Sequence, residues 1–182
     1  MKVELNRYDN SWYHHGSFLK RLLWMVVSIV FFESSWPWPV SIKCTLLRLF
    51  GAKIGQGCMI KPEVKIKYPW RLRVQDYVWI GEKVWIDNLD DVQIDSNVCI
   101  SQGAMLLTGN HDFTKPTFDL IIGKIHLHPG VWIGAWAVVC PGVTCYENAV
   151  LSVQSVATRN LENDKIYQGN PAQFKKVRLI VP

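Results

Sequence analysis

His111 is the side chain whose type and surroundings point most directly to chemistry. It stands in the segment Leu106-Leu-Thr-Gly-Asn-His111-Asp-Phe. A neutral imidazole has an unperturbed pKa of about 6.5, so it can accept a proton from a hydroxyl group at neutral pH. The preceding residues Thr108, Gly109 and Asn110 favour a turn that would aim the ring. These residues predict a general base, and a surface histidine in a polar turn is the alternative.

Metal-ligand patterns are weak in this chain. The five cysteines are odd in number and include no Cys-x-x-Cys pair, so neither a disulfide framework nor a thiolate zinc site is expected. His126 and His128 flank Leu127 on an expected strand, where both would face solvent. A zinc site of the carbonic-anhydrase kind would need a third histidine beside them. We therefore expect no metal, and a zinc-dependent enzyme of the carbonic-anhydrase kind remains a less favoured alternative.

Composition narrows the class of protein. At 182 residues the chain suits one well-buried domain, and its apolar fraction of 49% excludes a disordered protein. The net charge of +5 favours an anionic partner such as a nucleotide-containing cofactor or an acidic lipid surface. The basic residues form no long stripe, so we expect no nucleic-acid partner. Reduced cysteines are typical of a cytoplasmic protein.

Apolar residues recur every six positions through the centre of the chain. An α-helix has a period of 3.6 residues and an ordinary strand a period of two, so neither explains this spacing. A coil of short strands joined by tight corners does, because stacked coils share one core. The inward positions are predicted to be Ile54, Ile60, Ile66, Val74, Ile80, Ile86, Ile94, Ile100, Leu106, Ile121, Leu127, Ile133, Val139, Cys145, Leu151 and Ala157.

Three regions follow from these patterns. Residues 1–50 are an N-terminal segment with an apolar helix and a short second helix, and residues 51–158 are the coil. Residues 159–182 are a tail that should cover the last coils. A loop at 107–120 is predicted because fifteen residues separate Leu106 from Ile121, which is not a multiple of six. Segments that leave a scaffold in this way often carry function.

The N-terminal region contains the most apolar stretch of the chain, residues 18–32. Its apolar run is too short to span a bilayer. We expect it to be buried against the coil or an oligomer partner, with contact at a membrane interface or an export signal as the alternatives. The second helix should run from Pro39 to Phe50, with Gly51 at its end.

Trp79 and Trp85 are six residues apart, and each precedes an inward isoleucine. We expect both to lie on one outer face of the coil. A subunit interface or the N-terminal helix would then bury them.

The hexapeptide repeats, together with Trp132-Ile-Gly, Pro141-Gly-Val143 and Gly169-Asn-Pro-Ala172, resemble the hexapeptide-repeat acyltransferases. The segment around His111 looks like the loop that carries their catalytic histidine. Within that family, the chain is most similar to the exopolysaccharide acetyltransferases of the colanic acid type. That likeness covers nearly the whole chain and includes Asn10-Ser-Trp-Tyr13, Trp79-Ile-Gly-Glu-Lys-Val-Trp-Ile-Asp-Asn88 and Ser101-Gln-Gly103.

The resemblance implies a left-handed parallel β-helix and an acetyl-CoA-dependent O-acetyltransferase of exopolysaccharide or related glycan biosynthesis. His111 would be the general base in a direct attack by a sugar hydroxyl. The backbone N–H of Ala135 would stabilise the oxyanion. The resemblance implies a set of cofactor contacts at Trp132, Ala135, Val153, Thr158, Arg159 and Lys176. No metal is implied.

The acceptor would be a sugar or a lipid-linked oligosaccharide. The candidates for its hydrogen-bonding groups are Asp9, Asn10, Asp87 and Asn88. Ordinary turn-forming roles are the alternative for the last two residues. The family is usually trimeric, with active sites between neighbouring subunits, so the resemblance implies a homotrimer. We expect the protein to lie in the cytoplasm, either free or associated with the inner face of the membrane.

One departure from the family pattern concerns the wall of the cofactor tunnel. Val153 and Gln154 stand where the family has small residues, and they would narrow the tunnel. A β-helical scaffold or regulatory subunit without catalysis is therefore kept as an alternative function. The intact histidine loop argues against that alternative.

Overall fold

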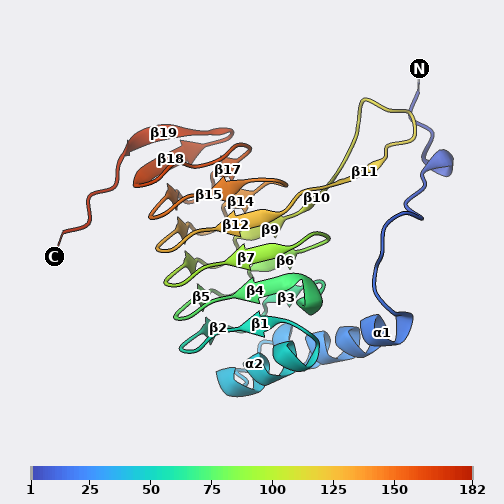
Figure 1. Ribbon diagram of the computed structural model, residues 1–182, viewed down its shortest axis with the longest axis horizontal. Coiled ribbons are helices and arrows are strands. Elements are labelled where there is room, and N and C mark those ends of the chain that lie inside the picture. The colour runs from blue at the N-terminus through green and yellow to red at the C-terminus, as the bar shows by residue number, and fades with distance from the viewer. Residues whose placement is uncertain (1, 182) are drawn as a thin grey trace.

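The computed structural model describes residues 2–181. Its central part is a solenoid of short strands stacked into three parallel sheets (Figure 1). Sheet A contains β1 (Lys53–Ile54), β4 (Leu72–Val74), β7 (Val92–Ile94), β12 (Ile125–Leu127) and β15 (Thr144–Cys145). Sheet B contains β2 (Met59–Ile60), β5 (Trp79–Ile80), β8 (Cys99–Ile100), β13 (Trp132–Ile133) and β16 (Val150–Leu151). Sheet C contains β3 (Lys65–Ile66), β6 (Trp85–Asp87), β9 (Met105–Leu107), β14 (Val138–Val139) and β17 (Val156–Ala157).

The core is built from the sixfold repeat. Each strand contributes an apolar residue to the interior, and residues in register stack from rung to rung, as Ile80, Ile100 and Ile133 do in sheet B. Burying such a side chain is worth roughly 1.5–3 kcal/mol. The predicted left-handed parallel β-helix is confirmed. Ile121 is an exception, because it lies on the excursion between β9 and β12 and is exposed.

The expected pairing of Trp79 and Trp85 on one face is wrong. Trp79 lies in β5 of sheet B, whereas Trp85 lies in β6 of sheet C. Consecutive hexapeptides occupy successive sides of the triangular coil, so a spacing of six places two residues on different faces. The residue that stacks on Trp79 is Cys99, on the next rung of the same sheet.

Several corners depend on glycine because neighbouring rungs approach closely. A Cβ on Gly81 would lie 2.6 Å from the backbone nitrogen of Gln102, and a Cβ on Gly134 would lie 2.6 Å from that of Val153. The need for glycine there comes from the close approach of the next backbone rather than from a positive φ.

The N-terminal region packs across the first rung with its helices after residue 17, whereas its first helical turn lies apart from that rung (Figure 1). It comprises η1 (Leu5–Arg7), α1 (Phe18–Val27), η2 (Ser28–Phe32), which is a π-helical turn, and α2 (Val40–Leu49). Trp24 holds α1 to the coil, since it is buried against Phe32 and Phe50 and its indole donates to the Ile66 carbonyl at 2.8 Å. No helix of residues 2–181 is long and apolar enough to cross a membrane.

Helix α2 protects the open edge of the solenoid. Lys43 is fully buried, and its Nζ donates to the carbonyl of Lys61 at 2.9 Å. Arg48 donates through Nη2 to the carbonyls of Ile54 and Gly55, both at 2.9 Å. These two cations bind carbonyl oxygens at the edge of the first rung. On an uncovered edge, the same oxygens would be free to pair with a strand of another chain.

The opposite end is closed by a hairpin. Strand β18 (Lys165–Gly169) extends sheet B by pairing in parallel with β16, and β19 (Ala172–Val177) folds back antiparallel to β18. The residues after Ala157 therefore continue the solenoid before they cover it. A short helical turn, η3 (Pro69–Arg71), widens one corner lower in the coil.

Candidate active site

The segment that carries His111 leaves the coil where sheet C passes to sheet A. It forms an antiparallel hairpin of β10 (Gly109–His111) and β11 (Leu120–Ile122), inserted between β9 and β12. Figure 1 shows this hairpin projecting away from the solenoid toward the N-terminal segment. The hairpin pairs His111 with Leu120, so the histidine sits near the point where the two strands separate.

The His111 ring is held on two sides. Its Nδ1 lies 2.9 Å from the carbonyl oxygen of Phe118, and its plane stacks on the Phe118 ring at 4.4 Å and 9°. Because a carbonyl oxygen only accepts, Nδ1 carries the proton and Nε2 has a free lone pair. Phe118 adopts a φ of 51°, an uncommon value for a residue with a side chain. The backbone of this turn is therefore strained at Phe118, and this strained conformation places the carbonyl beside His111.

Asp112 does not orient His111. Its carboxylate accepts hydrogen bonds from the backbone N–H of Thr114 at 3.1 Å and from the Thr114 hydroxyl, and these bonds lower the pKa of Asp112. The carboxylate therefore shapes the tip of the loop, and the carbonyl of Phe118 orients the ring. This partner is seven residues away in sequence and lies across the turn, so it is not apparent from the sequence.

Tyr8 is a neighbour of His111 that the sequence did not single out. Its ring meets the imidazole edge-on, with centroids 5.5 Å apart. The N-terminal segment reaches the loop because the backbone N–H of Glu4 donates to the Pro116 carbonyl at 2.8 Å. Asp9 and Asn10 follow Tyr8 directly, so two of the expected acceptor residues are next in sequence to a residue that contacts His111. The carboxylate of Asp9 accepts from the backbone N–H of Ser11, which lowers the pKa of Asp9.

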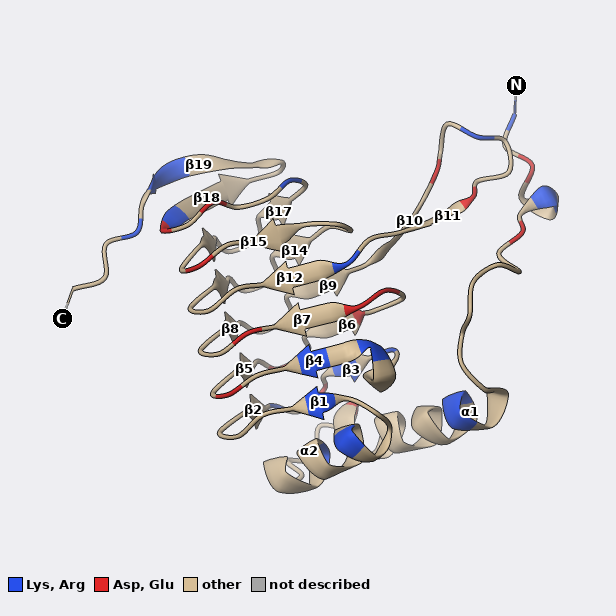
Figure 2. Ribbon diagram, viewed as in Figure 1, with Lys and Arg blue, Asp and Glu red and all other residues tan. Residues whose placement is uncertain are grey.

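The other two acceptor candidates have different environments. Asp87 is partly exposed at the end of β6, and its Oδ1 lies 2.9 Å from Lys67 Nζ. Asn88 is fully buried, and its amide accepts from the Tyr68 N–H at 2.9 Å and donates to the Tyr68 carbonyl at 2.7 Å. Asn88 therefore cannot contact an acceptor and joins two rungs instead. Figure 2 shows further acidic residues at the corner between β6 and β7.

A pocket of about 490 Å³ lies on sheet B and the corner that follows it. Its wall includes Trp132, Ala135 and Val153, three of the expected cofactor contacts. Among residues 2–181, the backbone N–H of Ala135 has no hydrogen-bond acceptor, so it is available to a ligand. Val153 is 58% exposed and lines the pocket without filling it.

The remaining expected cofactor contacts lie outside this pocket. Lys176 is not part of the pocket wall, but it pairs across the hairpin with Ile166, which is. Thr158 and Arg159 are exposed after β17 of sheet C, away from the pocket wall. Arg178, which follows β19, donates to the carbonyls of Gly130 at 2.8 Å and Asn148 at 3.1 Å, so it fastens the tail to the coil.

His111 and the pocket occupy different corners of one chain. The histidine loop leaves between sheets C and A, whereas Ala135 lies between sheets B and C. The two parts of the expected site are therefore not joined within a single chain.

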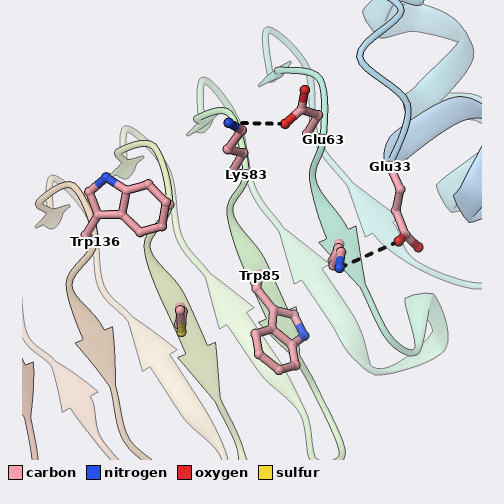
Figure 3. A pocket seen from close by; sticks show the side chains of 8 residues that line it. Glu33, Glu63, Lys83, Trp85 and Trp136 are labelled. Carbon is pink, nitrogen blue, oxygen red and sulfur yellow. Dashed lines mark ion pairs between the residues drawn. The ribbon is translucent and has the colours of Figure 1, made fainter.

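A second hollow, of about 420 Å³, lies on the outer face of sheet C (Figure 3). Trp85 and Trp136 flank it, and each carboxylate near its rim has a lysine partner. Lys83 Nζ lies 3.6 Å from Glu63, and Lys65 Nζ lies 4.0 Å from Glu33. These pairs balance the charge, and the hollow contains none of the residues that the sequence put forward for chemistry.

His126 and His128 are not simply solvated surface residues. His126 Nε2 lies 2.8 Å from Asp95 Oδ2, and His128 Nδ1 lies 3.8 Å from the same oxygen. Among residues 2–181 this is the one cluster whose ligand atoms are close enough together for a metal ion. It contains two histidines rather than the three that a carbonic-anhydrase site would need.

Comparisons with known proteins connect these features to enzymes of known class. The chain is 35% identical over 164 residues to WcaF of Escherichia coli (strain K12), named as a colanic acid biosynthesis acetyltransferase, and the match covers 90% of each protein. It is 25% identical over 145 residues to the galactoside O-acetyltransferase of the same strain, which covers 78% of this chain and 71% of that protein. A scan against protein-family models finds no match.

Solved structures with the same fold extend this comparison. A hexapeptide-repeat acetyltransferase from Vibrio cholerae aligns with a TM-score of 0.79 at 20% identity, covering 87% of this chain and 90% of that one. A galactoside acetyltransferase in complex with coenzyme A aligns with a TM-score of 0.78 at 22% identity, covering 87% and 80%. At these identities the likeness establishes the fold alone.

Proposed function

Because this chain belongs to the hexapeptide-repeat acetyltransferases of the colanic acid biosynthesis type, we propose that it transfers an acetyl group from acetyl-CoA to a sugar hydroxyl. The acceptor belongs to an exopolysaccharide or a related glycan. The observation that carries the proposal is the fixed tautomer of His111, whose Nδ1 faces the Phe118 carbonyl and leaves Nε2 free to accept a proton.

The reaction follows from that tautomer. The sugar hydroxyl attacks the thioester carbonyl carbon while Nε2 of His111 takes the hydroxyl proton. The tetrahedral intermediate carries an oxyanion, which collapses to break the carbon–sulfur bond. The proton on His111 then passes to the departing thiolate. The products are the acetyl ester and coenzyme A, and the histidine returns to its neutral form.

The pocket on sheet B is the proposed acetyl-CoA site. Its wall provides the unpartnered N–H of Ala135 as a donor for the oxyanion. Trp132 and Val153 would supply apolar surface for the pantetheine arm, and Lys176, which pairs with Ile166 of the wall, is the proposed cation for the phosphates. Thr158 and Arg159 remain proposed cofactor contacts, made to the acetyl-CoA that is bound in the pocket of a neighbouring subunit. In support, relatives of the same fold include one in complex with coenzyme A.

A homotrimer would unite the two halves of the site. His111 and Ala135 lie at different corners of the triangular coil, so the loop of one chain can meet the pocket of the next. Three copies related by a threefold axis close a ring in which every loop has a pocket. The exposed tryptophans Trp79 and Trp132 on sheet B provide apolar surface for such contacts.

The acceptor would enter between the N-terminal segment and the loop. Asp9, Asn10 and Asp87 are the proposed hydrogen-bonding groups for sugar hydroxyls. The side of α1 that faces away from the coil exposes Leu19, Leu23 and Val26, which suits contact with a lipid surface. A lipid-linked oligosaccharide on the cytoplasmic face of a membrane is the acceptor that fits both features.

The test is acetyl-CoA consumption against a panel of sugars and glycosides, with release of the free thiol as the readout. We expect turnover with at least one sugar, and a loss of at least ~100-fold in kcat for His111→Ala. His14→Ala is the control, since His14 is an exposed histidine in the N-terminal segment. Full turnover by His111→Ala would refute the base. If the wild type neither consumes nor binds acetyl-CoA, the scaffold alternative is favoured.

A further inference from the structure

Two columns of outward-facing side chains meet on sheet A. Gln93 of β7 and His126 of β12 are paired in register and form one column. Asp95 and His128 follow these strands directly, one residue after the paired Ile94 and Leu127, and form the second column. Neighbouring rungs are about 4.8 Å apart. The stacking therefore brings a carboxylate and two imidazoles together although 31 residues separate Asp95 from His126.

The two oxygens of the Asp95 carboxylate have different partners. Its Oδ1 accepts from Gln75 Nε2 at 2.9 Å and from Gln93 Nε2 at 3.0 Å. Its Oδ2 faces His126 Nε2 at 2.8 Å and His128 Nδ1 at 3.8 Å. The two glutamine amides thus hold one carboxylate oxygen in place and leave the other facing the imidazole nitrogens. Hydrogen bonds of this kind typically orient carboxylates that bind a metal ion.

The two histidines are also held in place. Their ring centroids are 3.9 Å apart, and the His128 ring stacks on Tyr146 with centroids 5.3 Å apart. Burial and the neighbouring His126 lower the pKa of His128. The three ligand atoms lie within 4.8 Å of one another. Atoms bound to one tetrahedral zinc ion are about 3.4 Å apart, a spacing between the 2.8 Å from His126 Nε2 to Asp95 Oδ2 and the 3.8 Å from His128 Nδ1 to the same oxygen.

We propose that Asp95, His126 and His128 bind a divalent transition metal ion, with one carboxylate and two imidazole ligands and the remaining positions taken by water. Two imidazoles and a carboxylate suit zinc and its first-row neighbours and disfavour magnesium or calcium. The site lies on sheet A and the following corner, apart from the acetyl-CoA pocket on sheet B. It takes no part in acetyl transfer.

The position of the site points to a structural task. Asp95 belongs to the rung below the catalytic excursion, and both histidines belong to the rung that resumes after it. An ion bound there would tie together the two rungs that the loop of residues 108–124 separates in the chain. The competing interpretation is an ordinary ion pair between Asp95 and His126, which needs no metal.

The test is a Zn²⁺ titration of the full, untagged chain by calorimetry after treatment with a chelator. We expect one ion per chain, and an affinity at least ~10-fold weaker in Asp95→Asn and in His128→Ala. The control His14→Ala, which removes an exposed histidine elsewhere, should bind like the wild type. Zn²⁺ should also raise the Tm of the wild type by several degrees and leave that of the two site variants unchanged.

The wild-type measurement decides the question even where a variant is unstable. Binding of less than one ion per chain by the wild type, or wild-type affinity in both site variants, would overturn the metal site and leave the ion pair. Circular dichroism with chelator present separates loss of the site from loss of the fold.

Discussion

The imidazole Nδ1 of His111 lies 2.9 Å from the carbonyl oxygen of Phe118, across the turn that joins β10 to β11. One hydrogen bond thus fixes both the tautomer and the direction of the ring. The carbonyl reaches that place because Phe118 adopts a positive φ and because its N–H donates to Lys115 at 3.1 Å. The proposed chemistry of the chain depends on the shape of this turn.

Truncation of Phe118 tests that dependence. Phe118→Ala removes the ring that stacks on the imidazole but keeps the carbonyl, so His111 should become less well oriented. We expect kcat to fall by roughly tenfold with the KM for acetyl-CoA unchanged, because misplacement of a base affects the chemical step. Steady-state kinetics provide the readout. Phe113→Ala is the matched control, since Phe113 lies in the same loop and is 76% exposed. Equal kinetics for the two variants would show that the stack plays no part.

Substitution of Val153 tests the position of the acetyl-CoA pocket. Val153→Trp places a large ring at the pocket wall, so the KM for acetyl-CoA should rise at least ~10-fold while the fold is retained. Val177→Trp, an equally large change on the exposed side of β19, should leave kinetics unchanged. An unaltered KM in Val153→Trp would place the cofactor elsewhere.

Removal of the Asn88 amide tests its structural role. Asn88→Ala would leave the N–H of Tyr68 buried without a partner, while the Tyr68 carbonyl would keep only its bond from the Arg71 N–H, which should lower the free energy of unfolding by about 1–3 kcal/mol. Denaturant unfolding measures this, with Asn163→Ala on the exposed tail as control. If Asn88→Ala kept full stability and only weakened sugar binding, the acceptor role expected from the sequence would be restored.

The buried hydroxyl of Tyr13 leads us to expect that the free energy of unfolding decreases at alkaline pH. Burial raises the pKa of Tyr13 to about 12, and its hydroxyl donates to the Leu89 carbonyl at 2.5 Å. The folded state therefore favours the neutral phenol. The contribution to stability is complete below pH 10, the ordinary pKa of tyrosine, and is lost as the pH rises toward 12.

Unfolding measured from pH 8 to pH 12 tests this sign. Tyr13→Phe should lower stability at pH 8 by about 1 kcal/mol and should weaken the decline above pH 10. Tyr77→Phe is the control, because Tyr77 is 54% exposed. A wild type and a Tyr13→Phe variant with parallel pH curves would contradict the assignment.

Much of the fold could be read from the chain because the sixfold repeat is a local pattern. An isoleucine such as Ile80 or Ile100 points inward whatever its neighbours in other rungs do, so the core followed from spacing alone. The same spacing misled for Trp79 and Trp85, because the face that a residue occupies depends on how many strands complete one turn. Ile121 also fits the spacing of six, but it lies on the excursion outside the coil, where that spacing does not direct a side chain into the core.

The site was only partly accessible in the same way. The sequence by itself determined that His111 lies on a segment ejected from a six-residue coil, because an interruption of the period is visible without coordinates. It also determined the family, through motifs that follow the chain from end to end.

Only the tertiary structure decided which groups meet, because such contacts join residues that the winding of the chain brings together. The Phe118 carbonyl faces His111 across a turn, Tyr8 arrives from the N-terminal segment, and Asn88 turns inward to bond a lower rung. Asp95 meets His126 and His128 for the same reason, since stacking of rungs ignores the length of the loop between them. Spacing along a chain fixes the direction of a side chain, but register between rungs fixes its neighbours.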